Sequence, residues 1–436
     1  MSPLRAIAFE IGRRAPMRSR LRPGHRFWGL ADQALTSGVS LVTTLVAAAA
    51  LDPAEFGGFA LALTAIYLVN TLQAGIITRP HNQIGAARSP DRYAAYTAAT
   101  ALTQVGFSAL TAALGLVATI VAAVAFPQHV PLTLALTFAG VAWQAQEFPR
   151  RVLYTEGRGG DAFLNDLISY GGQVVVLLAL VLIGHLTATS ALLAIGVTSA
   201  IGAAIGIVQI RHSLTRSLDP EAIRDNFALG KWLAAAEAAH WTSTQIYFFI
   251  AAVLLGPVAA ATIRATQVLF GPLRIVLMYL YSVLPAGLAR TRAREGHEAM
   301  YGEVRRVYWG LVPVLLAYCI PLALLAGPIL HLLYRDRYSD AAPVVVLTAV
   351  QYFFVCLIPV VSSLLQVEGL ARHLFLAQVY VSVVSIPFGW LLVLSMGVEG
   401  AVTGMAFGSI ATNVYALAVH WRSRARKRGE RASAAA

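Results

Sequence analysis

The feature that most limits the fold of this chain is a succession of long apolar segments. A helix needs about 18 or more mainly apolar residues to cross the hydrocarbon core of a bilayer. Segments of this length begin near twelve positions, which are Phe27, Gly58, Tyr93, Pro131, Ala162, Thr189, Leu229, Val258, Val307, Ala341, Leu374 and Gly400. Several run longer than the minimum, as expected for helices that tilt or extend past the membrane. We therefore predict an all-α polytopic membrane protein with twelve transmembrane helices.

Composition supports this prediction and excludes an ordinary soluble domain. Of the 436 residues, 58% are hydrophobic and 12% are charged, whereas soluble domains carry about 25% charged residues. Both cysteines, Cys319 and Cys356, lie inside apolar segments, so neither an exported disulfide framework nor a metal cluster is indicated. The first 26 residues are rich in arginine and lead into a full-length segment without a cleavage site, so no signal peptide is expected.

Positive charge is distributed unevenly between the two sets of connections, and this asymmetry predicts the topology. Connections after odd-numbered segments hold only Arg335 and Arg337. The other basic residues gather in the tails 1–26 and 422–436 and in the connections after even-numbered segments, at Arg79, Arg88, Arg92, Arg150, Arg151, Arg158, Arg211, Arg216, Arg224, Lys231, Arg290, Arg292, Arg294, Arg305, Arg306 and Arg372. Because such residues mark the cytoplasmic side, both termini are predicted to be cytoplasmic. The net charge of +12 therefore indicates membrane topology and not nucleic-acid binding.

The two tails extend this pattern beyond the apolar segments. The sequence RSRARKRGERASAAA at the C-terminal end is strongly basic. We expect it to be disordered and to lie near the anionic headgroups of membrane lipids.

The two halves of the chain share one plan. The sequence LDPAEFGGFALA, which begins at Leu51, aligns with LGPVAAATIRAT, which begins at Leu255. Farther along, YTEGRGGDAF aligns with LQVEGLARHLF, so that Glu156–Gly157 matches Glu368–Gly369. Transporters commonly use such repeats and bind substrate where the two repeats meet. The predicted organisation is a basic tail 1–26, a first six-helix lobe 27–210, a linker 211–228, a second six-helix lobe 229–421 and a basic tail 422–436.

Two arginines inside one apolar segment of the second half are the first candidate site. At 100° per residue, Arg264, Gln267 and Arg274 share one helix face, and the two arginines lie about 15 Å apart along the axis. Intramembrane ionisable groups usually face an aqueous cavity or a partner. We predict that they bind substrate, with Gly271 and Pro272 as a hinge between them. The alternative is that they form structural ion pairs with a carboxylate such as Glu237.

Other polar residues in the apolar segments suggest ion coupling and further substrate contacts. Glu237 and His240 lie one turn apart, and histidine titrates near physiological pH, so these two residues and Asp32 are candidates for ion coupling. A structural Glu–Arg pair would also explain Glu237, and an acidic residue near a helix N-terminus is favoured by the helix dipole. Asn70 and Gln73 are candidate cavity residues, although ordinary interhelical hydrogen bonds would also explain them.

The sequence lacks the motifs of the common membrane enzymes. It contains no Gly-Lys-Ser/Thr loop for nucleotide phosphates, no His/Cys cluster with metal-ligand spacing and no nucleophilic triad. Among the short exported connections, only Asp52 and Glu55 stand where a glycosyltransferase would need acidic residues. We therefore expect neither enzymatic activity nor a cofactor.

Four stretches, considered in their order along the chain, resemble a known superfamily. They are ALDPAEFGGFALALTAIYLVNTLQ, QEFPRRVLYTEGR, GPVAAATIRATQVLFGPLRIVLMYLYSVLP and LLYRDRYSDAAPVVVL. From about Phe27 to Trp421 the chain resembles the multidrug/oligosaccharidyl-lipid/polysaccharide (MOP) exporters, and among them the Wzx-like flippases of polysaccharide biosynthesis.

The resemblance implies a fold and an activity. It implies two parallel six-helix lobes around a central cavity, and alternating-access transport of a polyprenyl-pyrophosphate-linked oligosaccharide across the bacterial inner membrane for surface polysaccharide synthesis. Polysaccharide polymerase and glycosyltransferases are the implied protein partners. Cationic cavity residues carry the function in that family, and Arg264 and Arg274 are the positions that would correspond here. Guanidinium groups suit this role because their forked donors match phosphate oxygens.

Three other functions remain open from the sequence. An ion-coupled multidrug antiporter of the same superfamily would need a cavity dominated by carboxylates. A major-facilitator transporter also has parallel six-helix repeats, but its basic connection between the second and third helices is not matched by RPHNQIGAARSPDRY. A membrane-embedded glycan polymerase or ligase is disfavoured by the short exported connections.

Overall fold

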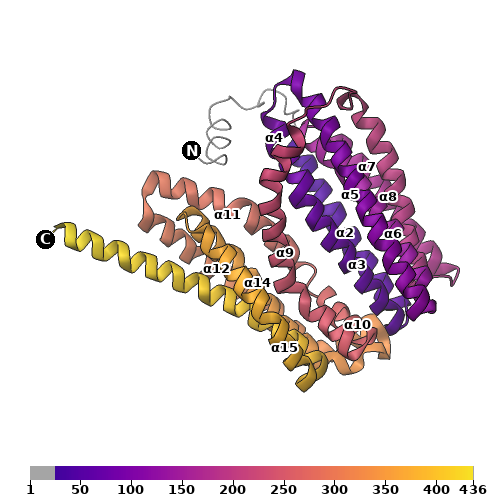
Figure 1. Ribbon diagram of the computed structural model, residues 1–436. Helices are drawn as coiled ribbons and strands as arrows, with labels where there is room; N and C mark the ends of the chain where they lie inside the picture. The colour runs from indigo at the N-terminus through magenta and orange to yellow at the C-terminus, as the bar shows by residue number, and fades with distance from the viewer. Residues whose placement is uncertain (1–24, 436) are drawn as a thin grey trace. The chain divides into compact units, whose positions relative to one another are not determined.

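The computed structural model describes residues 25–435, apart from a few side chains within that range, among them that of His240. Every regular element in this part of the chain is helical (Figure 1). The predicted N-terminal tail lies outside the described residues up to residue 24. The chain divides into two compact units, Met1–Ala238 and Ala239–Ala436, and the division falls within a helix, beyond the predicted linker 211–228.

The first unit is a helical bundle. Its long helices are α2 (His25–Ala50), α3 (Pro53–Gln73), α5 (Pro90–Ala125), α6 (Val130–Thr155), α7 (Gly159–Leu182), α8 (Ala188–Ile210) and the N-terminal part of α9 (Ala222–Leu255). A π-helical segment, η2 (Ala74–Thr78), and the short helix α4 (Arg79–Ile84) continue α3. Helix α6 packs most extensively on α8 and also contacts α5, while α2 packs on α7. A Cβ atom at Gly202 of α8 would lie 2.9 Å from the Gln146 side chain of α6, so a small residue is required there for close packing.

The second unit begins within α9. Its other helices are α10 (Pro257–Val268), α11 (Leu273–Glu295), α12 (His297–Leu324), α13 (Ala326–Tyr334), α14 (Ala342–Val367) and α15 (Ala371–Ala435). Helix α14 packs on α15, α11 and α12. Helix α15 is interrupted at Gly397, whose backbone is non-helical (φ 60°, ψ −134°). The interruption separates the two apolar segments predicted to begin near Leu374 and Gly400.

The helices confirm a multi-pass membrane protein. Within residues 25–435, nine helices are long and apolar enough to cross a membrane, and α9, bent by 53° between Ala239 and Thr244, brings the number to ten. The predicted number of twelve differs for two reasons. Two predicted segments lie within the single helix α15, and the C-terminal half of α6 is rich in polar residues. The exact number of crossings and their orientation stay predictions.

The C-terminal tail differs from the expectation of disorder. Helix α15 continues through Ala435, so the described part of the basic tail is helical. Apart from one glycine, the sequence after Trp421 consists mainly of Arg, Lys, Ala and Glu, which are good helix formers. Its helical conformation therefore agrees with its composition.

The two Glu–Gly turns predicted to be equivalent have the same backbone geometry. Gly157 ends α6 with φ 72°, and Gly369 ends α14 with φ 80°. In the first turn the amide of Arg158 donates to the carbonyl of Leu153, and in the second the amide of Leu370 donates to that of Leu365. This is the hydrogen bond of a Schellman cap, which needs a left-handed residue and therefore favours glycine. The local structure thus repeats where the sequence repeats.

Candidate functional site

A cavity of about 540 Å³ lies within the first unit. Its walls come from α2, α3, η2, α4, α6 and α7 and from the N-terminal part of α9. The lining residues are Gly29, Asp32, Gln33, Thr36, Tyr67, Asn70, Thr71, Ala74, Arg79, Trp143, Glu147, Arg150, Arg151, Tyr154, Tyr170 and Glu237. Their side chains include both charge signs, amides, hydroxyls and four aromatic rings, so the cavity is polar and aromatic.

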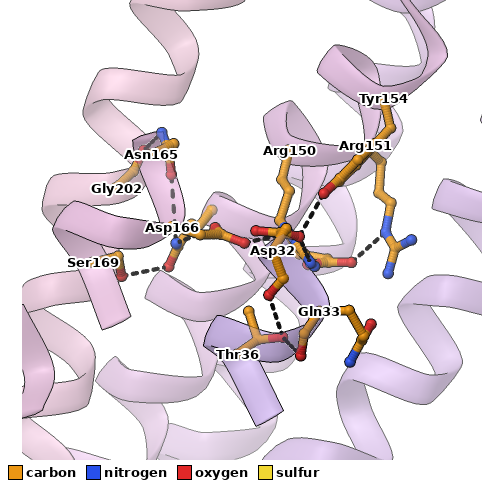
Figure 2. A network of polar contacts seen from close by, with 12 residues as sticks. Asp32, Gln33, Thr36, Arg150, Arg151, Tyr154, Asn165, Asp166, Ser169 and Gly202 are labelled. Carbon is orange, nitrogen blue, oxygen red and sulfur yellow. Dashed lines mark hydrogen bonds and ion pairs between the residues drawn. The ribbon is translucent and has the colours of Figure 1, made fainter. Parts of the chain in front are cut away.

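Arg150 is at the centre of the charged network at this cavity (Figure 2). One Nη atom lies 2.6 Å from Asp32 Oδ2 of α2, the other lies 2.9 Å from Glu147 Oε2, and Nε lies 2.6 Å from Asp166 Oδ2 of α7. The Arg150 side chain is 11% exposed and that of Asp166 is fully buried. Removing such charges from water costs several kcal/mol per ion unless they are paired. Arg150 of α6 therefore forms ion pairs with carboxylates of α2 and α7 as well as with Glu147 of its own helix.

Further contacts hold the members of this network in place. Tyr154 donates its hydroxyl hydrogen to Asp32 Oδ2 at 2.5 Å, and Arg151 Nε pairs with Glu147 Oε1 at 2.5 Å. Glu147 stands three residues before Arg150 and four before Arg151, so one turn of α6 brings both guanidinium groups to the same carboxylate. Glu147 is therefore paired within its own helix, and Arg150 also forms ion pairs with α2 and α7.

A second layer of hydrogen bonds supports Asp166 from the side of α7 and α8 (Figure 2). Gln146 donates from Nε2 to Asp166 Oδ1 at 3.2 Å and accepts from the hydroxyl of Ser169 at 3.0 Å. Asn165 Nδ2 donates to the carbonyl of Gly202 at 2.8 Å. These hydrogen bonds connect Gln146 of α6 to α7, and Asn165 of α7 to α8, on this side of the cavity.

Three aromatic rings form another part of the lining. The rings of Tyr67 and Trp143 lie 5.5 Å apart between centroids at 73°, and those of Trp143 and Tyr170 lie 6.3 Å apart at 79°. Edge-to-face packing of this kind is favourable for aromatic pairs. Trp143 thus links α3 to α7, and the three residues add apolar ring surface to a cavity that also holds charges.

Arg79 and Glu237 form an ion pair at the cavity between α4 and α9. Arg79 follows the π-helical segment Ala74–Thr78 directly. A Cβ atom at Gly75 would lie 2.6 Å from the backbone of Ala234, so this segment and α9 approach closely only because residue 75 is glycine. One extra residue in the helical turn changes the direction of the following side chains, and such bulges are frequent at functional sites.

The charged residues that line the cavity balance one another. Three guanidinium groups, those of Arg79, Arg150 and Arg151, face three carboxylates, those of Asp32, Glu147 and Glu237, so the formal sum of +3 and −3 is zero. Each of these six groups takes part in an ion pair. Within the described residues, no group of three or more His, Cys, Asp or Glu side chains is placed to hold a metal ion.

Three of the predicted site residues, Asp32, Asn70 and Glu237, line this cavity together. Gln73 does not, because it is fully buried and donates to Gln104 Oε1 at 2.8 Å and to the carbonyl of Gln144 at 2.9 Å. It makes the ordinary interhelical hydrogen bonds that the sequence left as an alternative. The side chain of His240 lies outside the described residues.

The predicted arginine face belongs to the second unit. The Arg264 guanidinium lies 4.9 Å from the centroid of the Phe248 ring, Gln267 Nε2 lies 3.7 Å from the sulfur of Met405, and Arg274 is exposed. Their role in substrate binding stays a prediction.

The predicted break at Gly271 and Pro272 is present. Helix α10 ends at Val268 and α11 begins at Leu273. The Tyr318 hydroxyl donates to the carbonyl of Leu269 at 2.7 Å, which satisfies an acceptor at the interruption. The chain is therefore interrupted between Arg264 and Arg274, whereas movement at this position stays a prediction.

The centre of the network in the first unit, Arg150, was not among the predicted site residues. Arg150 and Arg151, which were predicted to lie in a cytoplasmic connection, are part of α6, which continues to Thr155; their side of the membrane stays a prediction. Arg79, predicted to mark the cytoplasmic boundary, forms an ion pair with Glu237. One signal was available, because Asp166 is an ionisable residue within an apolar segment and such residues usually have a partner.

Comparisons with known proteins bear on the family and on the fold of the chain. The family model described as "Polysaccharide biosynthesis protein" matches residues 46–343. No curated protein matches the chain. Three solved structures illustrate the fold that the chain shares. The first is an inward-facing multidrug resistance MATE family transporter of the MOP superfamily, with a TM-score of 0.73 and 14% identity over 91% of this chain and 96% of that one. The second is a MOP superfamily transporter from Pyrococcus furiosus, with a TM-score of 0.62 and 14% identity over 92% of this chain and 95% of that one. The third is the inward closed conformation of the lipid II flippase MurJ, with a TM-score of 0.62 and 13% identity over 90% of this chain and 86% of that one.

At these identities the likeness concerns the fold alone, and the chain has the MATE-like fold of MOP superfamily transporters. The family match covers α3 to α13 and the start of α14. It therefore includes most of the residues that line the cavity and the whole of the interrupted α10–α11 segment.

Proposed function

The chain belongs to the polysaccharide biosynthesis protein family, and from this premise we propose that it is a flippase for a polyprenyl-pyrophosphate-linked oligosaccharide. It moves this cargo across the bacterial inner membrane by alternating access, with both termini in the cytoplasm. The observation that carries the proposal is the family match over residues 46–343 in a chain with a transporter fold. MurJ, whose name describes it as a flippase of lipid II, has a similar fold.

The pyrophosphate is assigned to the arginine face of the second unit. A diphosphate can cross an apolar medium only if its charge is met throughout the crossing. Arg274 is exposed within the unit, and Arg264 is half-buried beside an aromatic ring. Guanidinium groups donate paired hydrogen bonds to phosphate oxygens. The interruption at Gly271–Pro272 places a bend between the two arginines and acts as the hinge.

Coupling to a proton or sodium gradient is assigned to Asp32, Glu237 and His240. Asp32 pairs with Arg150 and accepts from Tyr154, and Glu237 pairs with Arg79. Either carboxylate must release its partner before it binds a cation, so coupling requires that an ion pair opens during the transport cycle. Glu237 is the more accessible of the two, because its side chain is 24% exposed and that of Asp32 is 2% exposed.

An ion-coupled multidrug antiporter is the second candidate. The carboxylates of Asp32, Glu147 and Glu237 at the cavity favour it, as does the fold shared with a multidrug resistance transporter. The equal number of arginines at the same cavity disfavours it, because an organic cation needs excess negative charge to replace its hydration.

The decisive experiment uses the purified full-length protein in liposomes. A polyprenyl-pyrophosphate oligosaccharide with a fluorophore on its sugar is incorporated, and an impermeant reductant quenches the label on the outer leaflet. We expect the protein to expose the inner-leaflet label to the reductant, and liposomes without protein to retain it. Accumulation of ethidium without movement of the lipid would support the antiporter. New glycan formed from donor lipid would show a polymerase or ligase.

A further inference from the structure

We propose that the cavity of the first unit is a carbohydrate subsite, which holds uncharged sugar residues of the cargo and not its diphosphate. The inference rests on the proposed function, because it assigns one part of the cargo to this cavity. A volume of about 540 Å³ lies within the range of roughly 300–1,000 Å³ for small-molecule pockets. Three properties of the lining decide which chemical class it accepts.

The first property is the pairing of every charge at the cavity. Arg150 contacts three carboxylates, Arg151 pairs with Glu147, and Arg79 pairs with Glu237. The formal charge of the lining is zero, and Asp166 behind Arg150 adds one negative charge. A diphosphate at Arg150, whose side chain is 11% exposed, would have to displace Asp32, Glu147 or Asp166 and leave that carboxylate without its partner, which is strongly unfavourable. An uncharged ligand requires no such exchange.

The second property is the set of aromatic rings. Tyr67, Trp143 and Tyr170 all line the cavity, and consecutive rings pack edge to face. Pyranose rings carry one face of C–H groups, which pack on aromatic surfaces while the hydroxyl groups stay directed to the sides. Neither a phosphate group nor a flexible polyprenyl chain has a comparable flat face with polar edges. The rings therefore favour a sugar.

The third property is hydrogen-bonding capacity that the protein leaves unused. In the part of the chain that the structure describes, the buried Oδ1 atom of Asn70 accepts no hydrogen bond. A buried acceptor without a partner is costly, so it points to a ligand that donates. Thr71 and Gln33 line the same cavity. Gln33 Nε2 donates to Ser37 Oγ at 3.1 Å, and amide and hydroxyl side chains both donate and accept. Sugar hydroxyl groups supply matching donors and acceptors, whereas an ionised diphosphate supplies only acceptors.

The test measures protection of a thiol in the full-length protein. In a background with Cys319→Ser and Cys356→Ser, a Thr71→Cys variant carries one thiol at the cavity, and a Ser217→Cys variant carries one in an exposed turn of the same unit. A thiol-reactive maleimide reports accessibility. The probes are inorganic pyrophosphate and the pooled oligosaccharides that mild acid releases from the lipid-linked fraction of cells that lack this protein. Under the proposed function, those cells accumulate the cargo.

We expect the oligosaccharide pool to slow labelling at position 71, not at position 217, and pyrophosphate to have no effect at either. Trp143→Ala should weaken this protection by about threefold to tenfold, the range expected for one lost aromatic contact, while Trp143→Phe should retain most of it. Arg274→Ala should leave the protection unchanged. Protection by pyrophosphate, protection by neither probe, or equal protection at both positions would overturn the carbohydrate subsite.

The liposome experiment separates this inference from the proposed function. If the lipid-linked oligosaccharide is flipped but the released oligosaccharides do not protect position 71, the flippase stands and the subsite is wrong. If the oligosaccharides protect position 71 but no lipid is flipped, the subsite stands and the proposed flippase is wrong.

Discussion

Arg150 of the first unit and Arg274 of the second unit lie in opposite environments. In the first unit Arg150 is 11% exposed and pairs with carboxylates from α2, α6 and α7. In the second unit Arg264 lies half-buried over the ring of Phe248 and Arg274 is exposed. A guanidinium whose donors are already used by three carboxylates stabilises the bundle, whereas an exposed guanidinium can still bind an anion. An arginine within an apolar segment therefore does not by itself indicate substrate binding, because its partners decide its role.

The largest expected effect is the loss of stability when Arg150 is replaced, which tests whether this arginine stabilises the bundle. In Arg150→Ala the carboxylates of Asp32, Glu147 and Asp166 lose a shared partner, and loss of one member of a buried ion pair costs about 3–5 kcal/mol. We expect a large fall in the thermal unfolding temperature of the purified protein, measured by size exclusion after heating in detergent. Arg294→Ala, at an exposed position near the end of α11, is the matched control and should unfold like the wild type.

The same experiment can contradict the structural role. Adding Asp166→Asn to Arg150→Ala removes one of the uncompensated charges and should recover part of the stability. If Arg150→Ala has the same thermal unfolding temperature as the wild type, the ion pairs of Arg150 do not hold α2, α6 and α7 together. Arg150 would then be available for binding, as we propose for Arg274.

The second prediction tests the arginines of the second unit. Arg264→Ala and Arg274→Ala should each reduce lipid flipping by about tenfold or more, because each removes charged hydrogen bonds to phosphate that contribute about 1.5–3 kcal/mol. Their unfolding temperatures should stay near that of the wild type, most closely for the exposed Arg274. Surface polysaccharide in cells that express each variant at normal levels is the second readout. Unchanged polysaccharide in both variants would refute the assignment of the pyrophosphate to this face.

The smallest expected effect concerns the ion pair of Arg79 and Glu237. Arg79 is paired, as Arg150 is, but it is also exposed, as Arg274 is. The side chains of Arg79 and Glu237 are 45% and 24% exposed, and exposed ion pairs typically contribute about 0.2–1 kcal/mol. A double-mutant cycle with Arg79→Ala and Glu237→Gln should therefore give a coupling free energy of this size. A clearly larger coupling free energy would show that this pair, like the ion pairs of Arg150, stabilises the bundle. Such a result would also argue against Glu237 as a carboxylate that opens during transport.

Local features of the sequence determined much of the fold. The length and apolar character of the segments predicted an all-helical membrane protein, since only a continuous apolar helix satisfies its own backbone in lipid. The Glu–Gly pairs at 156–157 and 368–369 were aligned as equivalent positions of the two halves, and both have a left-handed glycine and the same hydrogen bond. The interruption near Gly271–Pro272 was also predicted, because proline removes a backbone donor. Each of these features depends on residues within a few positions of one another.

The partners of the charged residues were decided only by tertiary structure. Arg150 and Asp32 are 118 positions apart, and Arg79 and Glu237 are 158 apart. The sequence indicated that Asp32 and Glu237 were unusual, but nothing within several residues of either one specifies its guanidinium partner. Gln73 and Asn70 lie three positions apart in α3, yet one bonds inside the bundle and the other lines the cavity. Helix formation and chain reversal are local, whereas the pairing of a buried charge depends on which helices pack together, and the packing of the whole unit decides that.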